Sequence, residues 1–282
     1  MKNETLFGEP DAFMTPETGS YAEDKYALVR LYCQLFSSGM KEKWRGKRTY
    51  LDLYSGAGKC QIKANSKVLL GSPLISLSVP DPFDSYIFCD KNSDAIESLR
   101  ARLIGYPGRR VSLIAGDCND LVEEICLLIP PDNLVLSFVD PFDIGLRFDT
   151  IKRVSQAGYG VDFLLLLAFQ MDAARGDNPK HYANPNNTKI DRMLGDADWR
   201  LRWEKEQNAG NTDFSKFLAL EFSRSMETIG YLRTELHQMR KIRTLDKHVP
   251  LYYLALFSRN KTAFKYWNEV LKYSTPQRGL FD

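Results

Sequence analysis

Four aspartates, Asp52, Asp90, Asp117 and Asp140, each follow a short apolar run of the sequence. Such runs are typical of buried strands, and ligands of an open parallel sheet bind beyond the carboxyl ends of its strands. Carboxylates there accept hydrogen bonds from hydroxyl and amino groups. Each aspartate could instead cap the helix after it, a common use of this residue. Four in succession favour one ligand-binding cleft.

Glycines follow the first of these aspartates in the spacing Asp52-x-x-x-Gly56-x-Gly58, which also contains Tyr54. Glycine lets the backbone turn sharply and approach a ligand without a Cβ in the way. Taken alone, the motif is better explained by an ordinary turn between a strand and a helix. Together with the later aspartates it predicts a nucleoside site.

The two aspartates that follow have different expected roles in that site. Asp90, with Lys91 beside it, is placed to accept both hydroxyls of a ribose. Asp117, with Cys118 beside it, is placed to accept from an exocyclic amine such as that of adenine.

Short β-rich runs alternate with helical segments over the first two thirds of the chain. The expected strands are 49–54, 86–89, 111–115, 134–139 and 161–169. The expected helices are 21–37, 72–77, 94–103, 119 or 120 to 128, and 148–154. This alternation indicates a doubly wound, mostly parallel α/β sheet of the Rossmann-like type, covered on both faces. Ser72 is expected to cap its helix, with Pro73 in the first turn.

The last third of the sequence is less regular. A helix is expected over 214–229, capped by Asp213 and ended by Gly230. Two further strands are expected over 231–236 and 251–258, followed by a closing helix capped by Asn260. The polar stretch 170–212 after the fifth strand is expected to be a helical insert or lid. We therefore predict one domain over 1–282, with 1–40 as an N-terminal helical extension.

Composition narrows the possible classes of protein. The chain has 38 Lys+Arg and 36 Asp+Glu, too balanced for phosphate binding over the whole surface. Its five cysteines are scattered and never form C-x-x-C, so neither a disulfide framework nor a zinc cluster is expected. The longest apolar run, 163–169, is far shorter than the ~20 residues that cross a bilayer. A soluble cytoplasmic protein without membrane contact is expected.

Two basic clusters could contact nucleic acid, although a solvated charged loop explains each one alone. They consist of Lys41, Lys43, Arg45, Lys47 and Arg48 around Trp44, and of Arg240, Lys241, Arg243, Lys247 and His248. Arg175, Asn178, His181 and Asn184 of the insert could line a substrate entrance. The three histidines are too dispersed to predict a metal site, and none is expected.

Several stretches carry a resemblance to known families. Asp52-Leu53-Tyr54-Ser55-Gly56-Ala57-Gly58 resembles the first motif of class I S-adenosylmethionine (SAM)-dependent methyltransferases, and Asp140-Pro141-Phe142 is similar to their fourth, D-P-P-[FY]. More closely, the chain resembles the three-Cys-motif partner proteins, in 50–58, 71–74, 116–119, 140–142 and 190–195 with Trp199. The resemblance covers about residues 20–275. It implies SAM as cofactor and a three-cysteine, radical-SAM-like protein as partner.

This resemblance implies direct methyl transfer, in which the protein contributes mainly orientation and desolvation. Asp140 and the Pro141 carbonyl would accept hydrogen bonds from a target amine, and Asp143 would take up the released proton. Phe142 would stack on a nucleobase, although core packing explains a phenylalanine there equally well.

The sequence also departs from the family pattern. Asp90 comes 38 residues after Asp52, against the ~20 expected between a glycine turn and its ribose acid. The additional residues form the polar segment 59–68, which separates the glycine turn from the next helix. The positive end of that helix dipole is therefore expected to act on the ligand from Gly71 and Ser72. The fourth motif has a single proline. The leading hypothesis is a methyltransferase that acts on an amino group of a nucleic acid base. The alternative is a non-catalytic adaptor that acts through its partner protein. Nicotinamide dinucleotide binding is disfavoured because G-x-G-x-x-G is missing.

Overall fold

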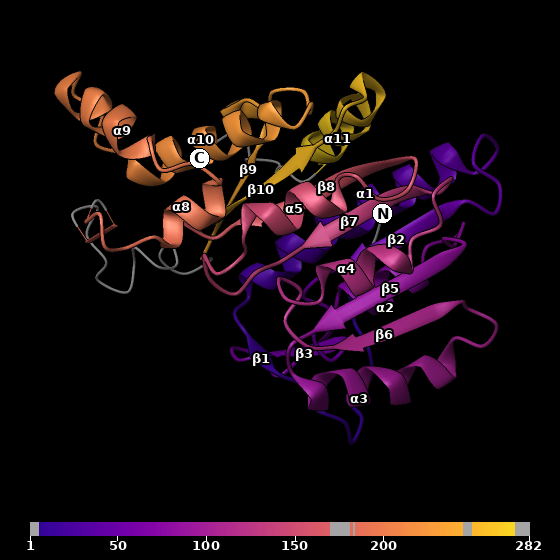
Figure 1. Ribbon diagram of the computed structural model, residues 1–282. Helices are drawn as coiled ribbons and strands as arrows, with labels where there is room; N and C mark the ends of the chain where they lie inside the picture. Colours follow the sequence, from indigo (N-terminus) through magenta and orange to yellow (C-terminus); the bar gives the residue numbers. More distant parts are fainter. Residues whose placement is uncertain (1–5, 170–180, 183, 245–249, 274–282) are drawn as a thin grey trace.

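A seven-stranded, mostly parallel sheet forms the centre of the protein (Figure 1). The computed structural model describes residues 6–169, 181–182, 184–244 and 250–273. The strands are, in spatial order, β6 (Val111–Ala115), β5 (Ser85–Asp90), β2 (Arg48–Asp52), β7 (Leu134–Val139), β8 (Gly160–Leu167), β10 (Pro250–Phe257) and β9 (Arg240–Arg243). The first five are parallel, and β10 pairs antiparallel with both β8 and β9.

The order of the strands reverses beside β2. From β2 the chain moves outward through β5 and β6, and then returns to place β7 on the other side of β2. A crevice at the carboxyl ends of the strands forms at such a point. The predicted fold class, a doubly wound, mostly parallel α/β sheet of the Rossmann-like type, is therefore confirmed.

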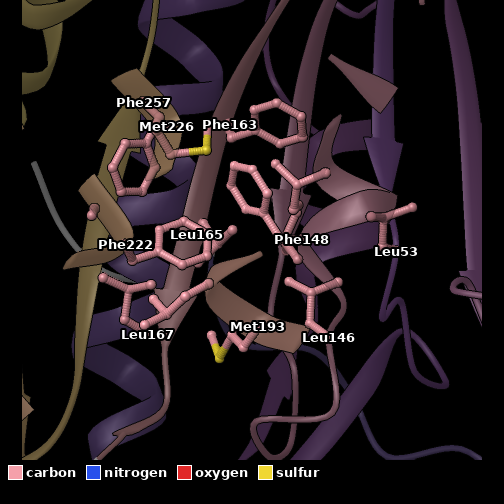
Figure 2. Close-up of a cluster of buried hydrophobic side chains, with 14 of the residues drawn as sticks. Leu53, Leu146, Phe148, Phe163, Leu165, Leu167, Met193, Phe222, Met226 and Phe257 are labelled. Atoms are coloured by element: carbon pink, nitrogen blue, oxygen red, sulfur yellow. The ribbon is translucent and has the colours of Figure 1, made fainter. Parts of the chain in front are cut away.

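Apolar side chains cover both faces of the sheet. On one face pack α1 (Tyr21–Met40), α2 (Ser72–Leu77), α3 (Ser93–Arg102) and α11 (Lys261–Tyr273). On the other pack α4 (Val122–Leu127), α5 (Phe148–Val154), α8 (Lys189–Leu194) and α10 (Phe214–Thr228). Figure 2 shows the second of these cores, where Phe148, Phe163 and Phe222 meet. Successive strand residues alternate between the two cores, as for Leu164 and Leu165.

A second, small sheet occupies the segment that was expected to be a polar insertion. It consists of β1 (Glu17–Thr18), β3 (Lys59–Ile62) and β4 (Val68–Leu70), and β3 pairs with both others. Ile62 and Leu69 are fully buried and pack with Leu6, Ala22 and Ile75. Alternation of polar and apolar residues over 59–62 was the missed sign of a strand.

The helical insert after β8 is held together by Asp191. Its carboxylate Oδ1 accepts from Trp199 Nε1 at 2.7 Å and from Arg200 at 2.5 Å, which joins α8 to α9 (Trp199–Asn208). Met193, Leu194 and Trp199 are buried in the same place. The stretch 190–195 with Trp199 is therefore a packing unit. The suggested entrance residues Arg175 and Asn178 lie outside the described residues.

Three expectations for local structure were wrong. Residues 231–236 form no strand, because Thr234 bonds through its side chain to the Leu256 carbonyl, and the ladder with β10 begins only at Arg240. Helix α4 begins at Val122, since the Asn119 side chain accepts from Arg147 N and Thr150 Oγ1. Gly71, and not Ser72, is the N-cap of α2.

The ends of the last two helices agree with the sequence-based expectations. Asp213 caps α10 by accepting from Lys216 N at 3.0 Å, and Asn260 accepts from Thr262 N at the start of α11. Within the described residues, every helix is too short or too polar to cross a membrane.

Candidate functional site

The acidic residues at the strand ends share one edge of the sheet. Asp52 pairs in register with Phe88 of β5 and Phe138 of β7, two residues before Asp90 and Asp140 respectively. Asp117 follows Ala115, the register partner of Asp90. The charges of Asp90 and Asp140 both act on Asp52 and raise its pKa. The structure thus brings together the aspartates that the sequence singled out.

Asp90 holds the glycine turn in place. Its Oδ2 accepts from Gly56 N at 2.7 Å, and its Oδ1 accepts from Asn92 N at 2.9 Å. Gly56 has a φ of +59°, and a Cβ built there would meet nothing within 4 Å. The space above this turn is therefore open to a ligand. Gly58 (φ +85°) has a different role, because its Cβ would lie 2.8 Å from Leu99 Cδ1.

Asp52 is fully buried, and its carboxylate is only partly satisfied. Oδ1 accepts from Tyr54 N at 3.2 Å, whereas Oδ2 has no hydrogen-bond partner among the described residues. The buried hydroxyl of Ser55 likewise has no hydrogen-bond partner among the described residues. Burial raises the pKa of Asp52 to about 7, and the Ser72 hydroxyl and the Tyr54 amide oppose that shift. Asp52 Oδ2 and the Ser55 hydroxyl thus have hydrogen-bonding capacity left for a ligand.

The remaining predicted cofactor residues differ in exposure. Asp117 is exposed, and its Oδ1 accepts from Asn119 N at 2.8 Å. Cys118 is buried beside Tyr54, and burial raises the pKa of its thiol to about 11, so the thiol stays protonated. Lys91 is exposed next to Asp90, and Ser72 is buried near Asp52.

Asp140 forms an ion pair that the sequence did not predict. Lys25 of α1 places its Nζ 2.5 Å from Asp140 Oδ2, with 9% and 18% of the two side chains exposed. Burial lowers the pKa of Lys25, but the Asp140 carboxylate more than offsets it, so the net shift is upward. Lys25 follows Ala22 by three residues and precedes Val29 by four, on the buried face of α1. A charged residue on the apolar face of a predicted helix was the sequence signal that could have pointed to Lys25.

The residues after Asp140 differ in exposure. Pro141 is buried, whereas Phe142 is 66% exposed and therefore does not belong to the core. Asp143 is also exposed, and its Oδ1 accepts from Gly145 N at 2.8 Å. Neither the Phe142 ring nor the Asp143 carboxylate is part of the apolar core.

A buried arginine ties the N-terminal segment to the glycine turn. Arg102 of α3 binds both oxygens of Asp11, at 2.9 and 2.6 Å. It also donates to the carbonyls of Met14 and Ala57, at 2.9 and 2.5 Å. The guanidinium holds the pKa of Asp11 well below its usual range. Because Ala57 lies between Gly56 and Gly58, Arg102 supports the turn from behind.

The two basic clusters lie at opposite ends of the strands of the central sheet. Arg48 begins β2, so the first cluster lies at the amino ends of the strands, away from the aspartates. Arg48 is buried against Asp84 and the Ser37 carbonyl, so its guanidinium is not available to a phosphate. Arg243 ends β9 at the edge where β8 also ends. Lys247 and His248 lie outside the described residues.

Comparisons with known proteins add similar folds but no family. No protein-family model matches the chain, and no curated protein matches it in sequence. Among solved structures it is similar to magnesium protoporphyrin IX methyltransferase of Synechocystis with bound SAH (8% identity, 91% of this chain, 92% of that chain, TM-score 0.42). It is also similar to an O-methyltransferase of tomaymycin synthesis from Streptomyces achromogenes in complex with SAM (12% identity, 91% of this chain, 92% of that chain, TM-score 0.43). A third similar structure is a SAM-dependent methyltransferase from Anabaena variabilis (10% identity, 90% of this chain, 100% of that chain, TM-score 0.36).

All three of these structures are methyltransferases. At such low identity and TM-score the likeness carries no argument about activity or ligand. The fold assignment rests on the strand order and directions described above.

Proposed function

We propose that this chain is a SAM-dependent methyltransferase that acts on an amino group of a nucleic acid base. The observation that carries the proposal is the group of carboxylates around the open Gly56 turn: Asp52, Asp90 and Asp117, with Asp140 beside them. The proposal is supported by the arrangement of hydrogen-bond acceptors and by the resemblance of residues 52–58 and 140–142 to methyltransferase motifs.

The residues at this edge fit the parts of SAM. Asp90 has lone pairs left for two ribose hydroxyls after accepting from Gly56 and Asn92. The exposed Asp117 can accept from the adenine amine. The unpartnered Asp52 Oδ2 and Ser55 Oγ can accept from an ammonium group. Four carboxylates against two lysines, Lys25 and Lys91, also favour a ligand with net positive charge.

Bound SAM would supply a methyl group on a positively charged sulfur, and the protein would orient the acceptor. Lys25 donates to Asp140 Oδ2, so Asp140 Oδ1 and the Pro141 carbonyl would accept the two hydrogens of an amine. This arrangement directs the nitrogen lone pair toward the methyl group. The exposed Phe142 ring would stack on the base, and Asp143 would receive the released proton. Lys25 would hold the Asp140 side chain in place.

One observation favours the second candidate, an adaptor that keeps the fold and acts through a partner. Asp140 Oδ2 is already bound by the buried Lys25, as a purely structural carboxylate would be. The proposed partner in either case is a three-Cys-motif protein, on the basis of sequence resemblance. Arg240 and Arg243, at the same edge as the aspartates, are the described basic residues best placed to contact a nucleic acid substrate.

A transfer assay separates the two candidates. The purified chain, with and without the three-Cys-motif protein, is incubated with SAM carrying a tritiated methyl group and with mixed RNA or DNA oligonucleotides. We expect label in nucleic acid, lost in Asp140→Asn but kept in Asp132→Asn, which changes an exposed acid at the other edge. Label unchanged in a folded Asp140→Asn protein would contradict the catalytic assignment. SAM binding without transfer to any substrate would favour the adaptor.

A further inference from the structure

A cavity lined by described residues lies far from the aspartates, at the amino ends of the parallel strands. We call it the amino-edge cavity; it has a volume of about 830 Å³. Its walls are the end of α1 with Lys43 and Trp44, the beginnings of β7 and β8, and the first turns of α11. Leu134 in its wall begins β7, and Asp140 follows the end of that strand, about 20 Å away at 3.3 Å per residue.

Two aromatic rings form one side of the amino-edge cavity. Trp44 and Tyr159 have their ring centroids 4.6 Å apart, at an angle of 55°. Tyr159 is 71% exposed, although it packs on a neighbour and follows Gly158 in a tight turn (φ +63°). Exposed aromatic rings at the rim of a cavity provide a stacking surface for a planar ligand.

Two lysines of this cavity, Lys43 and Lys261, form no ion pair with an acidic residue within the described part of the chain. Four of the five basic residues of the first cluster are paired: Lys41 with Asp81, Arg45 with Glu42, Lys47 with Asp132 and Arg48 with Asp84. Lys43 is the exception, and it lies over the Trp44 ring at 5.9 Å. Lys261 lies across the cavity in the first turn of α11. The unpaired positive charge of this region therefore points to an anion beside the stacking surface.

An acidic group lies in the wall of the same cavity. Asp162 of β8 is partly buried near Ser258 and Arg259, and burial raises its pKa to about 7. Arg259 itself is held by the carbonyls of Ser155 and Ile229. A carboxylate beside a stacking surface accepts hydrogen bonds from the amino group of a base such as cytosine or adenine.

From the aromatic pair, the two unpaired lysines and Asp162, we propose that the amino-edge cavity binds a nucleoside monophosphate unit. The base contacts Trp44 and Tyr159, its amino group donates to Asp162, and the phosphate lies between Lys43 and Lys261. The unit is either a free nucleotide or one nucleotide of a single strand. This site is independent of the proposed methyl transfer.

Tryptophan fluorescence gives a direct test. Of the four tryptophans, Trp199, Trp203 and Trp267 are at most 3% exposed, so an added ligand that quenches emission reports mainly on Trp44. The protein, with and without saturating SAM, is titrated with CMP, UMP, cytidine and an eight-residue oligocytidylate. We expect saturable quenching by CMP and weaker binding of both UMP and cytidine.

Matched variants identify the phosphate contacts. Lys43→Ala and Lys261→Ala should each weaken CMP binding about tenfold, as for the loss of a charged hydrogen bond. Lys47→Ala, an exposed cation of the same segment paired with Asp132, should leave it unchanged. All three side chains lie at the surface, and equal melting temperatures would confirm that the variants fold.

Each result decides something. Tighter binding of the oligonucleotide than of CMP, weakened by the same two substitutions, supports a single strand as the source; equal or weaker binding supports a free nucleotide. No saturable quenching by millimolar CMP, competition by SAM, or equal effects of Lys47→Ala and Lys43→Ala would overturn the proposal. Equal affinity for CMP and UMP would overturn the role of Asp162.

Discussion

Lys25 of the N-terminal helix and Asp140 at the end of β7 form a buried ion pair, with 2.5 Å between Nζ and Oδ2. The pair joins residues 115 positions apart in sequence and connects α1 with the edge where the aspartates meet. Helix α1 is thus part of both the core and the candidate site, because it also buries Leu28, Tyr32 and Phe36. Loss of the Lys25–Asp140 pair would therefore affect both the stability of the protein and the geometry of the candidate site.

The first prediction concerns that pair. Lys25→Met should lower the free energy of unfolding by about 3 kcal/mol, because it leaves Asp140 largely buried without its partner. Urea denaturation measures the change. Lys41→Met, at the exposed pair with Asp81, should cost less than about 1 kcal/mol. Equal costs for the two substitutions would show that burial of the Lys25 pair contributes nothing.

The second prediction concerns Gly56. Gly56→Ala should cost about 1 to 2 kcal/mol of stability, because its φ of +59° disfavours a Cβ, and it should also weaken SAM binding by filling the open space. Gly108→Ala is the control, since Gly108 has a φ of +78° and equal open space but lies in the turn before β6. It should lose stability only. Calorimetric titration of both variants with SAM checks the difference.

The third prediction is a pH dependence. Folding raises the pKa of Asp52 from 3.8 to about 7, so between these values the folded protein binds the proton more tightly than the unfolded chain. The contribution of Asp52 to stability is therefore full below pH 3.8 and is lost as the pH rises to about 7. The loss amounts to about 4 kcal/mol.

Asp52→Asn isolates this contribution, because Asp162 titrates in the same range in both proteins. Denaturation at several pH values should show the stability of wild type falling relative to the variant between pH 4 and 7, and a constant difference above pH 8. A difference that does not change with pH would mean that Asp52 is not perturbed by burial.

The fourth prediction concerns Phe142. Because 66% of the side chain is exposed, Phe142→Ala should change the free energy of unfolding by less than about 0.5 kcal/mol. If the ring stacks on the acceptor base, kcat/KM for methyl transfer should fall at least about fivefold, with SAM affinity unchanged. Loss of stability without loss of transfer would assign Phe142 to packing.

Local patterns predicted the parallel sheet closely. The apolar runs ending at Val139 and Ala115 became β7 and β6 within the expected bounds, since a buried parallel strand needs apolar residues on both faces. The acidic residues at one edge followed from that order of elements. Residues 231–236 were wrongly assigned because their apolar residues pack outside the ladder, which depends on tertiary contacts.

Long-range polar contacts were beyond prediction. Lys25 and Arg102 each stand on the buried stripe of a helix, but their partners Asp140 and Asp11 are 115 and 91 residues away. The basic segment around Trp44 suggested one charged surface, whereas four of its five cations are paired with nearby acids. Which charges remain unpaired is decided only by the fold.

Binding of SAM tests the central claim most directly. Calorimetric titration of the purified protein should show saturable binding of one SAM per chain and no binding of NAD. Asp90→Ala should abolish the heat of SAM binding, because Asp90 both holds Gly56 and faces the ribose in the proposed site. No response of the folded wild-type protein to millimolar SAM, or unchanged affinity in a folded Asp90→Ala protein, would contradict the account.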